Sequence, residues 1–269
     1  MPELPEVETT VRGLKTKVLE RTFVGLWADI KKFKGLSRRL KGKKIKKVWR
    51  RGKNIVLDLS QGFSLLIHQK MTGHLLYDNW NKKDKANNYI HLKFFLDNGK
   101  ILALSDLRKF AKVELWKTKD LKKNLSSLGL EPLDRNFTFE KFKKVVTNKK
   151  GKIKQVLMNQ EVIAGIGNIY SDEILWRARV HPFRQGDKLT EKELKNIYKY
   201  IKLVLKRAIE LRGESISDYR DLFGQKGGFD KMRKVYRREG EDCSRCGIKI
   251  KRAKMGSRST YFCPNCQKL

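Results

Sequence analysis

The first residues of the chain, Met1-Pro2-Glu3, are of types that could carry out covalent chemistry. Proline at position 2 permits removal of the initiator methionine, which would leave Pro2 with a free secondary amine. An α-amine has a reference pKa near 7.7–8.0 against 10.4 for lysine, so its neutral fraction at pH 7 is roughly a few hundred times larger. A neutral secondary amine can attack carbon and form an iminium, and Glu3 could transfer a proton. The same residues could instead be a helix start without chemistry.

The four cysteines form a second group with chemical potential. Their pattern is Cys243-x2-Cys246-x16-Cys263-x2-Cys266, the spacing of a zinc ribbon in which two C-x2-C pairs hold one tetrahedral ion. Four thiolates leave no open coordination position, so we expect one structural Zn²⁺ and no catalytic metal. The hairpin between the pairs carries the basic residues Lys249, Lys251, Arg252, Lys254 and Arg258, so we expect its tip to approach a phosphate backbone.

The charge of the chain indicates a polyanionic partner. The 269 residues include 63 Lys+Arg and only 29 Asp+Glu, a formal net charge of +34. Such a field favours nucleic acid first and an acidic membrane second, although codon bias can also enrich lysine. The start of the chain does not resemble a signal peptide, and no apolar run approaches the roughly 18 residues of a membrane helix. We therefore expect a cytoplasmic protein without a membrane partner.

The first 130 or so residues predict a short helix followed by a β-sandwich or barrel-like domain. The helix is expected at Val7–Leu14. Two hairpins are expected because strand-like runs flank turn signals. The first joins Asn54–Leu59 to Phe63–His68, and the second joins Tyr89–Leu96 to Ile101–Leu104.

The hydrophobic period changes after about Gly151. Thr190 to Leu211 carries apolar residues at helical spacing, with Thr190 and Glu193 placed to form a capping box and Gly213 placed to end the helix. Residues 236–269 are too few to fold without their metal.

The opening Met1–Thr9, the run Gly165–Tyr170 and the four-cysteine segment occur together in the order and spacing of one family. From Pro2 to Lys268 the chain resembles bacterial formamidopyrimidine-DNA glycosylases. The resemblance implies an α+β multidomain fold. An N-terminal helix plus β-sandwich (residues 1–132) precedes a helical domain with a helix–two-turns–helix element and a lesion-capping loop (133–233), and a zinc-ribbon β-hairpin (234–269) ends the chain.

The resemblance also implies an activity. A member of this family is a monomeric, bifunctional DNA glycosylase and AP lyase of base excision repair. It acts on double-stranded DNA with oxidised bases or abasic sites and removes 8-oxoguanine and formamidopyrimidines. By matching segments, Pro2 would attack C1′ and form the Schiff base that leads to β- and δ-elimination, and Glu3 would be the proton donor. Lys53 would contact phosphates and assist elimination, although composition allows it to be one more surface lysine. Arg258 would hold phosphates around the lesion.

Further positions match DNA-contacting residues of the family. Met71, Arg108 and Phe110, which we call the insertion residues, would fill the space left by the everted nucleotide; without the resemblance, Met71 and Phe110 could be ordinary core residues. Asn168 would bind a phosphate at a helix start, Lys149 would contact DNA, and Ser215–Phe229 would close over the extruded base. The chain departs from the family pattern at Tyr89, where a histidine is usual, and at Lys109 and Ala111, which replace the Arg and Gly of Arg-Arg-Phe-Gly.

Two other interpretations remain open from the sequence. Endonuclease VIII shares Pro2, Glu3 and the architecture but prefers oxidised pyrimidines; Leu4-Pro5-Glu6-Val7 and the long segment after Gly213 favour the purine-specific branch. A non-catalytic zinc-ribbon protein that binds nucleic acid, for example at the ribosome, would share the charge and the ribbon, but it would not require the combination of Pro2, Glu3 and Lys53.

Overall fold

The computed structural model describes residues 1–215 and 218–269. The chain divides into two compact units, one formed by Met1–Ser127 with Ala208–Asp230 and the other by Leu128–Arg207 with Lys231–Leu269. Each unit contains its own cluster of buried apolar side chains.

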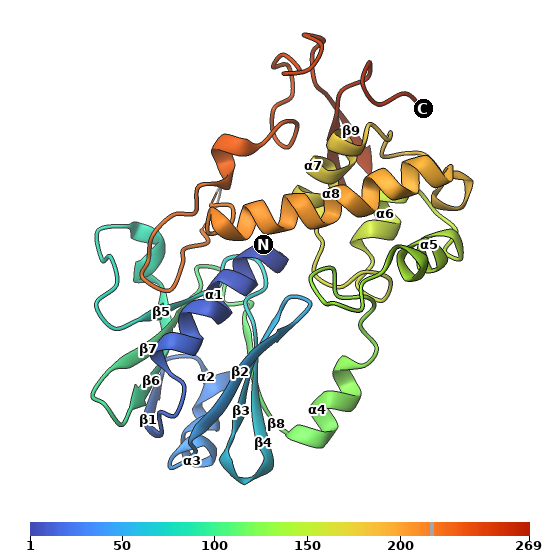
Figure 1. Cartoon of the computed structure of the whole chain (residues 1–269). Coiled ribbons are helices and arrows are strands. Elements are labelled where there is room, and N and C mark those ends of the chain that lie inside the picture. Colours follow the sequence, from blue (N-terminus) through green and yellow to red (C-terminus); the bar gives the residue numbers. More distant parts are fainter. Residues whose placement is uncertain (216–217) are drawn as a thin grey trace. The chain divides into compact units, whose positions relative to one another are not determined.

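The first unit contains two antiparallel sheets, each with four strands among the described residues (Figure 1). One sheet has the order β1-β6-β7-β5 and the other has the order β2-β3-β4-β8. The strands are β1 (Phe23–Ala28), β2 (Ile45–Arg51), β3 (Asn54–Leu59), β4 (Phe63–His68), β5 (His74–Tyr77), β6 (Ile90–Leu96), β7 (Ile101–Ser105) and β8 (Lys112–Lys117). The β-sandwich expected from the sequence is therefore present.

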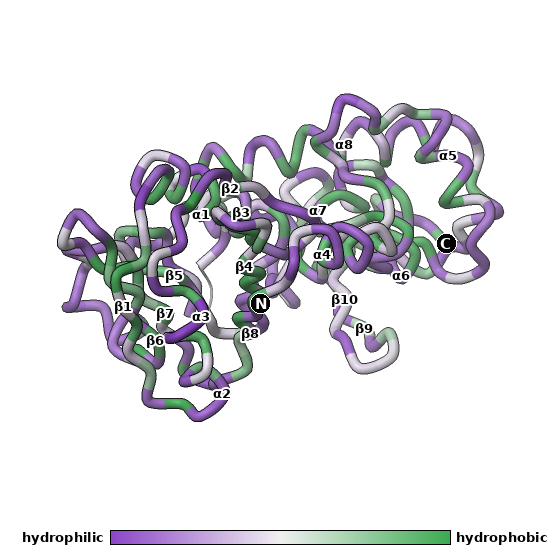
Figure 2. Tube along the Cα trace, turned by 90° about the horizontal axis from the view of Figure 1, so that it is seen from below, coloured by the Kyte–Doolittle hydropathy of each residue, from purple (hydrophilic) through white to green (hydrophobic). Residues whose placement is uncertain are grey.

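Alternating apolar residues place one face of each sheet in the core. In β6, Leu92, Phe94 and Leu96 are almost fully buried at every second position, as expected where one face of a strand is covered. The rings of Phe23 and Phe94 lie 5.4 Å apart across the β1–β6 pair. In Figure 2 the strands carry many green, hydrophobic positions, whereas the turns between them are largely purple.

Both predicted hairpins are confirmed. β3 and β4 pair in antiparallel register on either side of the turn at Ser60–Gly62. The turn fits because Gly62 has φ +73°, a conformation that glycine adopts without a steric penalty. β6 and β7 pair on either side of Asp97-Asn98-Gly99, and the N–H of Gly99 donates to the carbonyl of Leu96 at 3.0 Å.

The first helix, shown in blue in Figure 1, is longer than the sequence predicted. The helices of the first unit are α1 (Leu4–Lys17), α2 (Lys31–Lys34), α3 (Leu36–Leu40) and α4 (Thr118–Leu125). The predicted range, Val7–Leu14, was based only on the apolar face of α1. This face is formed by Val7, Val11 and Leu14 and packs in the sandwich core. The helix begins earlier because Glu3 and Glu6 form a capping box and Pro5 lies in its first turn.

The second unit is helical and ends in a β-hairpin. Its elements are α5 (Phe139–Thr147), α6 (Ile153–Met158), α7 (Asn168–Ala178), α8 (Glu191–Glu210, of which residues from Ala208 on belong to the first unit), β9 (Lys251–Met255) and β10 (Arg258–Phe262). The helix predicted at Thr190–Leu211 is confirmed as α8. Its capping box is also present, since Thr190 N donates to Glu193 Oε2 at 2.8 Å and Glu193 N donates to Thr190 Oγ1 at 3.3 Å. No helix among the described residues is long and apolar enough to cross a membrane.

Candidate functional site

The amino-terminal residues are buried at the start of α1. Pro2 is buried and Glu3 is only 2% exposed. Glu6 Oε2 accepts a hydrogen bond from Glu3 N at 2.7 Å, and the Glu3 carboxylate accepts one from the backbone N–H of Glu6. This pair of bonds fixes the carboxylate of Glu3 at the positive end of the helix.

Lys53 is held near this helix start by its turn. It is 7% exposed and follows Gly52, whose φ of +56° turns the chain between β2 and β3. Arg50 donates through Nη1 to the carbonyl of Gly52 at 2.8 Å and through Nε to Glu8 of α1 at 3.0 Å. The guanidinium of Arg50 thereby connects the turn that carries Lys53 to α1.

Glu3, Glu6 and Lys53 all act electrostatically on the amino-terminal amine. Desolvation lowers the pKa of the Met1 α-amine; the carboxylates of Glu3 and Glu6 oppose the shift, and the Lys53 ammonium adds to it. An amine at the next residue would share this buried, lysine-flanked surrounding. Desolvation favours a neutral and therefore nucleophilic amine. The structure thus brings together three of the residues singled out in the sequence, namely Pro2, Glu3 and Lys53.

Glu6 also connects the helix start to the segment after α8. Glu6 Oε1 accepts from Glu214 N at 2.8 Å, and Tyr219 Oη donates to the carbonyl of Glu6 at 3.1 Å. Gly213 has φ +80°, and a Cβ atom there would lie 2.6 Å from Glu6 Oε1, so only glycine fits. The predicted capping loop, 215–229, follows this anchor; its residues 216 and 217 lie outside the described residues.

The insertion residues are grouped on two adjacent loops of the first unit. Met71 and Phe110 are 43% and 50% exposed. Arg108 Nη1 lies 3.0 Å from the sulfur of Met71, and its guanidinium lies 4.6 Å from the centre of the Phe110 ring. The alternative of ordinary core packing for Met71 and Phe110 is therefore wrong. Exposed apolar side chains next to a guanidinium suit insertion between bases.

Tyr89 lies beside the same loop. Its side chain is exposed, and its carbonyl accepts a hydrogen bond from the backbone N–H of Asp106 at 2.8 Å, at the start of the loop that carries Arg108 and Phe110. A phenol in this position can donate to a phosphate or sugar oxygen, although it cannot carry the positive charge of a protonated histidine.

In the second unit, Asn168 begins α7 after the glycine-containing turn that the sequence indicated. Gly165 has φ +96°, and Gln160 fixes the turn, since its amide donates to the carbonyls of Met158 and Ile166 at 2.8 Å and accepts from Gly165 N at 2.8 Å. Among the described residues, the buried Oδ1 of Asn168 has no hydrogen-bond partner. An anion at this helix start would be bound by the backbone N–H groups and by the Nδ2 donor of Asn168, whereas Oδ1 can only accept a hydrogen bond.

The remaining basic candidates are exposed. Lys149 follows the end of α5, where its N–H donates to the carbonyl of Val146 at 3.3 Å. Arg258 begins β10 directly after the tight turn at Gly256, whose φ is +59°. A hollow of about 270 Å³ is lined by α6 and by the hairpin tip that includes Arg258.

The four cysteines converge in the second unit as their spacing predicted. Their sulfur atoms all lie within 4.8 Å of one another; Cys243 Sγ is 3.9 Å from Cys266 Sγ, and Cys246 Sγ is 3.5 Å from Cys263 Sγ. Zn–S bonds of about 2.3 Å in a tetrahedron require S–S separations of roughly 3.8 Å. The residues therefore fit one structural Zn²⁺.

His68 is a residue near the site that sequence reasoning missed. It ends β4, and its Nδ1 accepts from Lys70 N at 3.0 Å. Desolvation lowers its pKa to about 4, with further lowering from Lys70 and Lys53. His68 is therefore a neutral imidazole at pH 7, within electrostatic reach of Lys53 and of the loop that carries Met71. The position of His68 relative to Lys53 depends on strand pairing, so the residues next to His68 in the sequence do not indicate it.

Comparison with known proteins identifies matching family models over most of the chain. Residues 1–113 match the N-terminal domain of formamidopyrimidine-DNA glycosylase, residues 128–220 match the H2TH domain of the same enzyme, and residues 240–269 match a zinc finger found in FPG and IleRS.

Full-length relatives and solved structures agree with these models. The formamidopyrimidine-DNA glycosylases of Pelotomaculum thermopropionicum and Heliobacterium modesticaldum are 40% and 38% identical to the chain, with all of each sequence covered. The structure is also similar to a mutant of the Lactococcus lactis FPG in complex with Fapy-dG-containing DNA, with a TM-score of 0.90 and 33% identity over all of both chains. A second similar structure is the Lactococcus lactis Fpg bound to DNA with an abasic site, with a TM-score of 0.90 and 32% identity over 99% of this chain and 100% of that one. The chain belongs to the formamidopyrimidine-DNA glycosylase family.

Proposed function

We propose that this DNA glycosylase is bifunctional: it removes oxidised purines, 8-oxoguanine and formamidopyrimidines, from duplex DNA and then cleaves the strand as an AP lyase. The observation that carries the proposal is that Pro2, Glu3 and Lys53 are all buried, with Glu3 and Lys53 acting electrostatically on the amino terminus. Two further points support it. The net charge of +34 suits a DNA substrate, and the similar Lactococcus lactis enzymes were crystallised with DNA that contains Fapy-dG or an abasic site.

The chemistry begins once Met1 has been removed, because with Met1 attached the nitrogen of Pro2 is an amide. The secondary amine of Pro2 forms a bond to C1′ of the damaged nucleotide as the bond from C1′ to the base breaks. Glu3 donates a proton to the base as it leaves. The N–H proton of Pro2 then passes through Glu3 to O4′ as the C1′–O4′ bond breaks and the sugar ring opens. The product is an iminium that joins Pro2 to C1′.

The iminium then acts as the electron sink for elimination. Loss of the proton at C2′ expels the 3′ phosphate in β-elimination, and a second elimination expels the 5′ phosphate. The ammonium of Lys53 stabilises the negative charge on these phosphates. Its burial near the start of α1 supports this assignment over that of a surface lysine.

The remaining candidates hold the duplex. Met71, Arg108 and Phe110 fill the space that the everted nucleotide leaves, with Arg108 facing the orphaned base. Phosphate and sugar contacts come from Tyr89, Lys149, Asn168 and Arg258. A Zn²⁺ held by the four cysteines would fix the hairpin that carries Arg258, and four thiolates would leave it no open coordination position.

The test compares wild type with Pro2→Gly, both checked by mass for loss of Met1. We expect wild type to excise 8-oxoguanine opposite cytosine. We expect Pro2→Gly to lose at least about 100-fold in kcat, the scale of losing nucleophilic assistance, with DNA affinity nearly unchanged. If Pro2→Gly lost DNA affinity by the same factor as kcat, Pro2 would have a structural role and would not be the nucleophile. Preferential excision of an oxidised pyrimidine by wild type would favour the endonuclease VIII specificity instead.

A further inference from the structure

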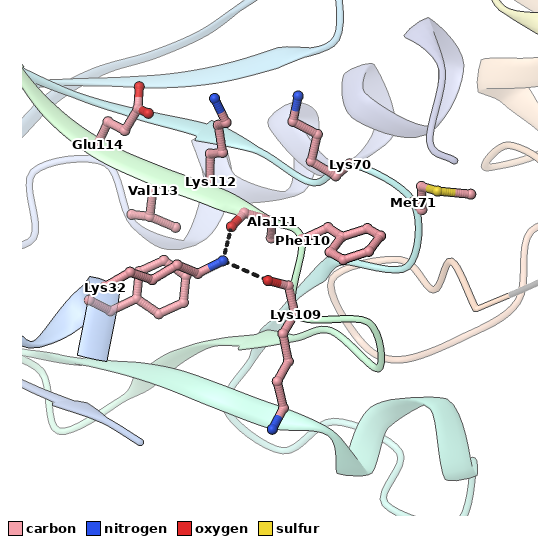
Figure 3. A pocket seen from close by; sticks show the side chains of 10 residues that line it. Lys32, Lys70, Met71, Lys109, Phe110, Ala111, Lys112, Val113 and Glu114 are labelled. Carbon is pink, nitrogen blue, oxygen red and sulfur yellow. Dashed lines mark hydrogen bonds between the residues drawn. The ribbon is translucent and has the colours of Figure 1, made fainter. Parts of the chain in front are cut away.

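The loop that carries Arg108 and Phe110 is held from outside by a lysine of α2. Lys32 Nζ donates to the carbonyl of Lys109 at 2.6 Å and to the carbonyl of Ala111 at 2.8 Å, the two carbonyls on either side of Phe110 (Figure 3). Lys109 has φ +59°, a left-handed conformation that costs free energy for a residue other than glycine. Both carbonyls turn toward one ammonium, so Lys32 stabilises this conformation.

Four further hydrogen bonds of the loop are made within its immediate surroundings. Asp106 Oδ2 accepts from Ala111 N at 2.7 Å, and the carbonyl of Asp106 accepts from Lys109 N at 3.1 Å. Thr72 donates through its hydroxyl to Asp106 and accepts through the same oxygen from Arg108 N at 3.0 Å. Lys32 contributes the contacts that come from the far side of the loop, 77 and 79 residues away in sequence.

Side-chain packing restrains Phe110 only weakly. A cavity of about 700 Å³ opens beside it, lined among others by Phe33, Met71 and Val113, and Figure 3 shows the Phe110 ring on the same side of this cavity as Met71. The ring is 50% exposed and lies against the guanidinium of Arg108, a side chain of the same loop, so packing restrains it less than it would a buried ring. The direction of the ring therefore depends on the backbone of residues 109–111.

We propose that Lys32 is a positioning residue for insertion: its ammonium holds residues 109–111 so that Phe110 and Arg108 are already oriented when they enter the duplex. This inference rests on the proposed function of the insertion residues. A loop ordered before binding loses less conformational entropy when the base is everted. Lys32 acts through the loop backbone and needs no contact with DNA.

A direct phosphate contact by Lys32 is the competing interpretation, and its neighbour offers a matched control. Lys31 lies on the same helix and is also exposed. Lys31→Met and Lys32→Met remove the same charge, and only Lys32→Met removes the bonds to the loop. Lys32→Arg retains a donor that can reach two carbonyl oxygens.

The first measurement is amide hydrogen exchange of residues 106–112 in the free protein, where the N–H groups of Arg108, Lys109 and Ala111 report opening of the loop. We expect faster exchange in Lys32→Met, unchanged exchange in Lys31→Met and restored protection in Lys32→Arg. This measurement uses no DNA. It therefore tests the loop contact even if wild type cleaves no lesion-containing duplex, an outcome that would overturn the proposed function alone.

The second measurement is kcat and KM on 8-oxoguanine opposite cytosine. In Lys32→Met we expect kcat to fall at least about tenfold, the scale of losing one charge-assisted hydrogen bond. KM should equal that of Lys31→Met, and activity should be restored in Lys32→Arg. Cleavage at an abasic site should fall less, because no base must be unstacked. The proposal would be overturned if Lys31→Met and Lys32→Met had the same kcat, or if Lys32→Met changed only KM. It would also be overturned if amide exchange of residues 106–112 were unchanged in Lys32→Met.

Discussion

Lys154 Nζ lies 2.8 Å from Asp172 Oδ1, and the two side chains are 1% and 0% exposed. The ammonium also donates to the carbonyl of Ser259 and to Thr260 Oγ1, both at 3.0 Å, and Asp172 Oδ2 accepts from Tyr261 N at 3.0 Å. A buried ion pair between α6 and α7 thus binds β10, the strand that begins at Arg258. Burial raises the pKa of Asp172, and the Lys154 ammonium opposes this shift.

Breaking this pair from one side should destabilise the second unit. Lys154→Met leaves the carboxylate of Asp172 buried without its counter-ion, and we expect the free energy of unfolding in urea to fall by about 3–5 kcal/mol. The double variant Lys154→Met with Asp172→Leu removes both charges and should recover part of this loss.

The exposed pair Lys195–Glu191, also at 2.8 Å, provides the control for that experiment. Lys195→Met should change the free energy of unfolding by only about 0–1 kcal/mol, because both partners are hydrated. Similar small effects for Lys154→Met and Lys195→Met would contradict the structural role of the buried pair.

Removal of zinc should weaken DNA binding before it unfolds the sandwich. The cysteine cluster packs with Trp176, Val235 and Tyr261 in a core that belongs to the second unit, so its loss leaves the core of the first unit intact. We expect a chelator to lower DNA affinity at least about tenfold, the scale of one charge-assisted phosphate contact.

Fluorescence anisotropy measures the DNA affinity, and hydrogen exchange in β3–β4 shows whether the sandwich stays folded. Added Zn²⁺ should restore binding, and normal binding by zinc-free protein would reject the role of Arg258.

Acid should destabilise the first unit through His68. Its pKa is about 4 in the folded protein and 6.5 for an unperturbed histidine, so between these values the unfolded chain binds more protons. The resulting stabilisation is complete above pH 6.5 and is lost as the pH falls toward 4. His68→Gln removes this contribution, and we expect the fall in unfolding free energy between pH 6.5 and 4 to become smaller by up to about 3 kcal/mol. The free energy of unfolding is measured in urea at each pH. If it changed with pH equally in wild type and His68→Gln, this role of His68 would be contradicted.

Features that depend on neighbouring residues could be predicted from the sequence. The β3–β4 hairpin follows from its glycine-containing turn, and α8 follows from its apolar period and the Thr190–Glu193 capping box. The zinc ligands were also predictable, because C-x2-C spacing alone determines which sulfur atoms can share an ion. The start of α1 was misplaced because an apolar face does not show where capping begins.

Features that depend on distant contacts could not be predicted. Lys32 is one of many lysines in a strongly basic chain, and only the folded loop shows that its ammonium lies between two carbonyl oxygens. The buried Lys154 likewise looks like any surface lysine in the sequence. For Pro2, Glu3 and Lys53, residue types predicted the chemistry, whereas burial and mutual proximity required the fold.

Borohydride trapping tests the central claim, that Pro2 is the nucleophile, most directly. Protein confirmed by mass to lack Met1 is incubated with a duplex that carries 8-oxoguanine opposite cytosine, and borohydride reduces any iminium to a stable amine. We predict a covalent protein–DNA adduct whose peptide map places the bond on Pro2, and no adduct with Pro2→Gly. An adduct on a lysine such as Lys53, or none on any lesion-containing duplex, would contradict the account.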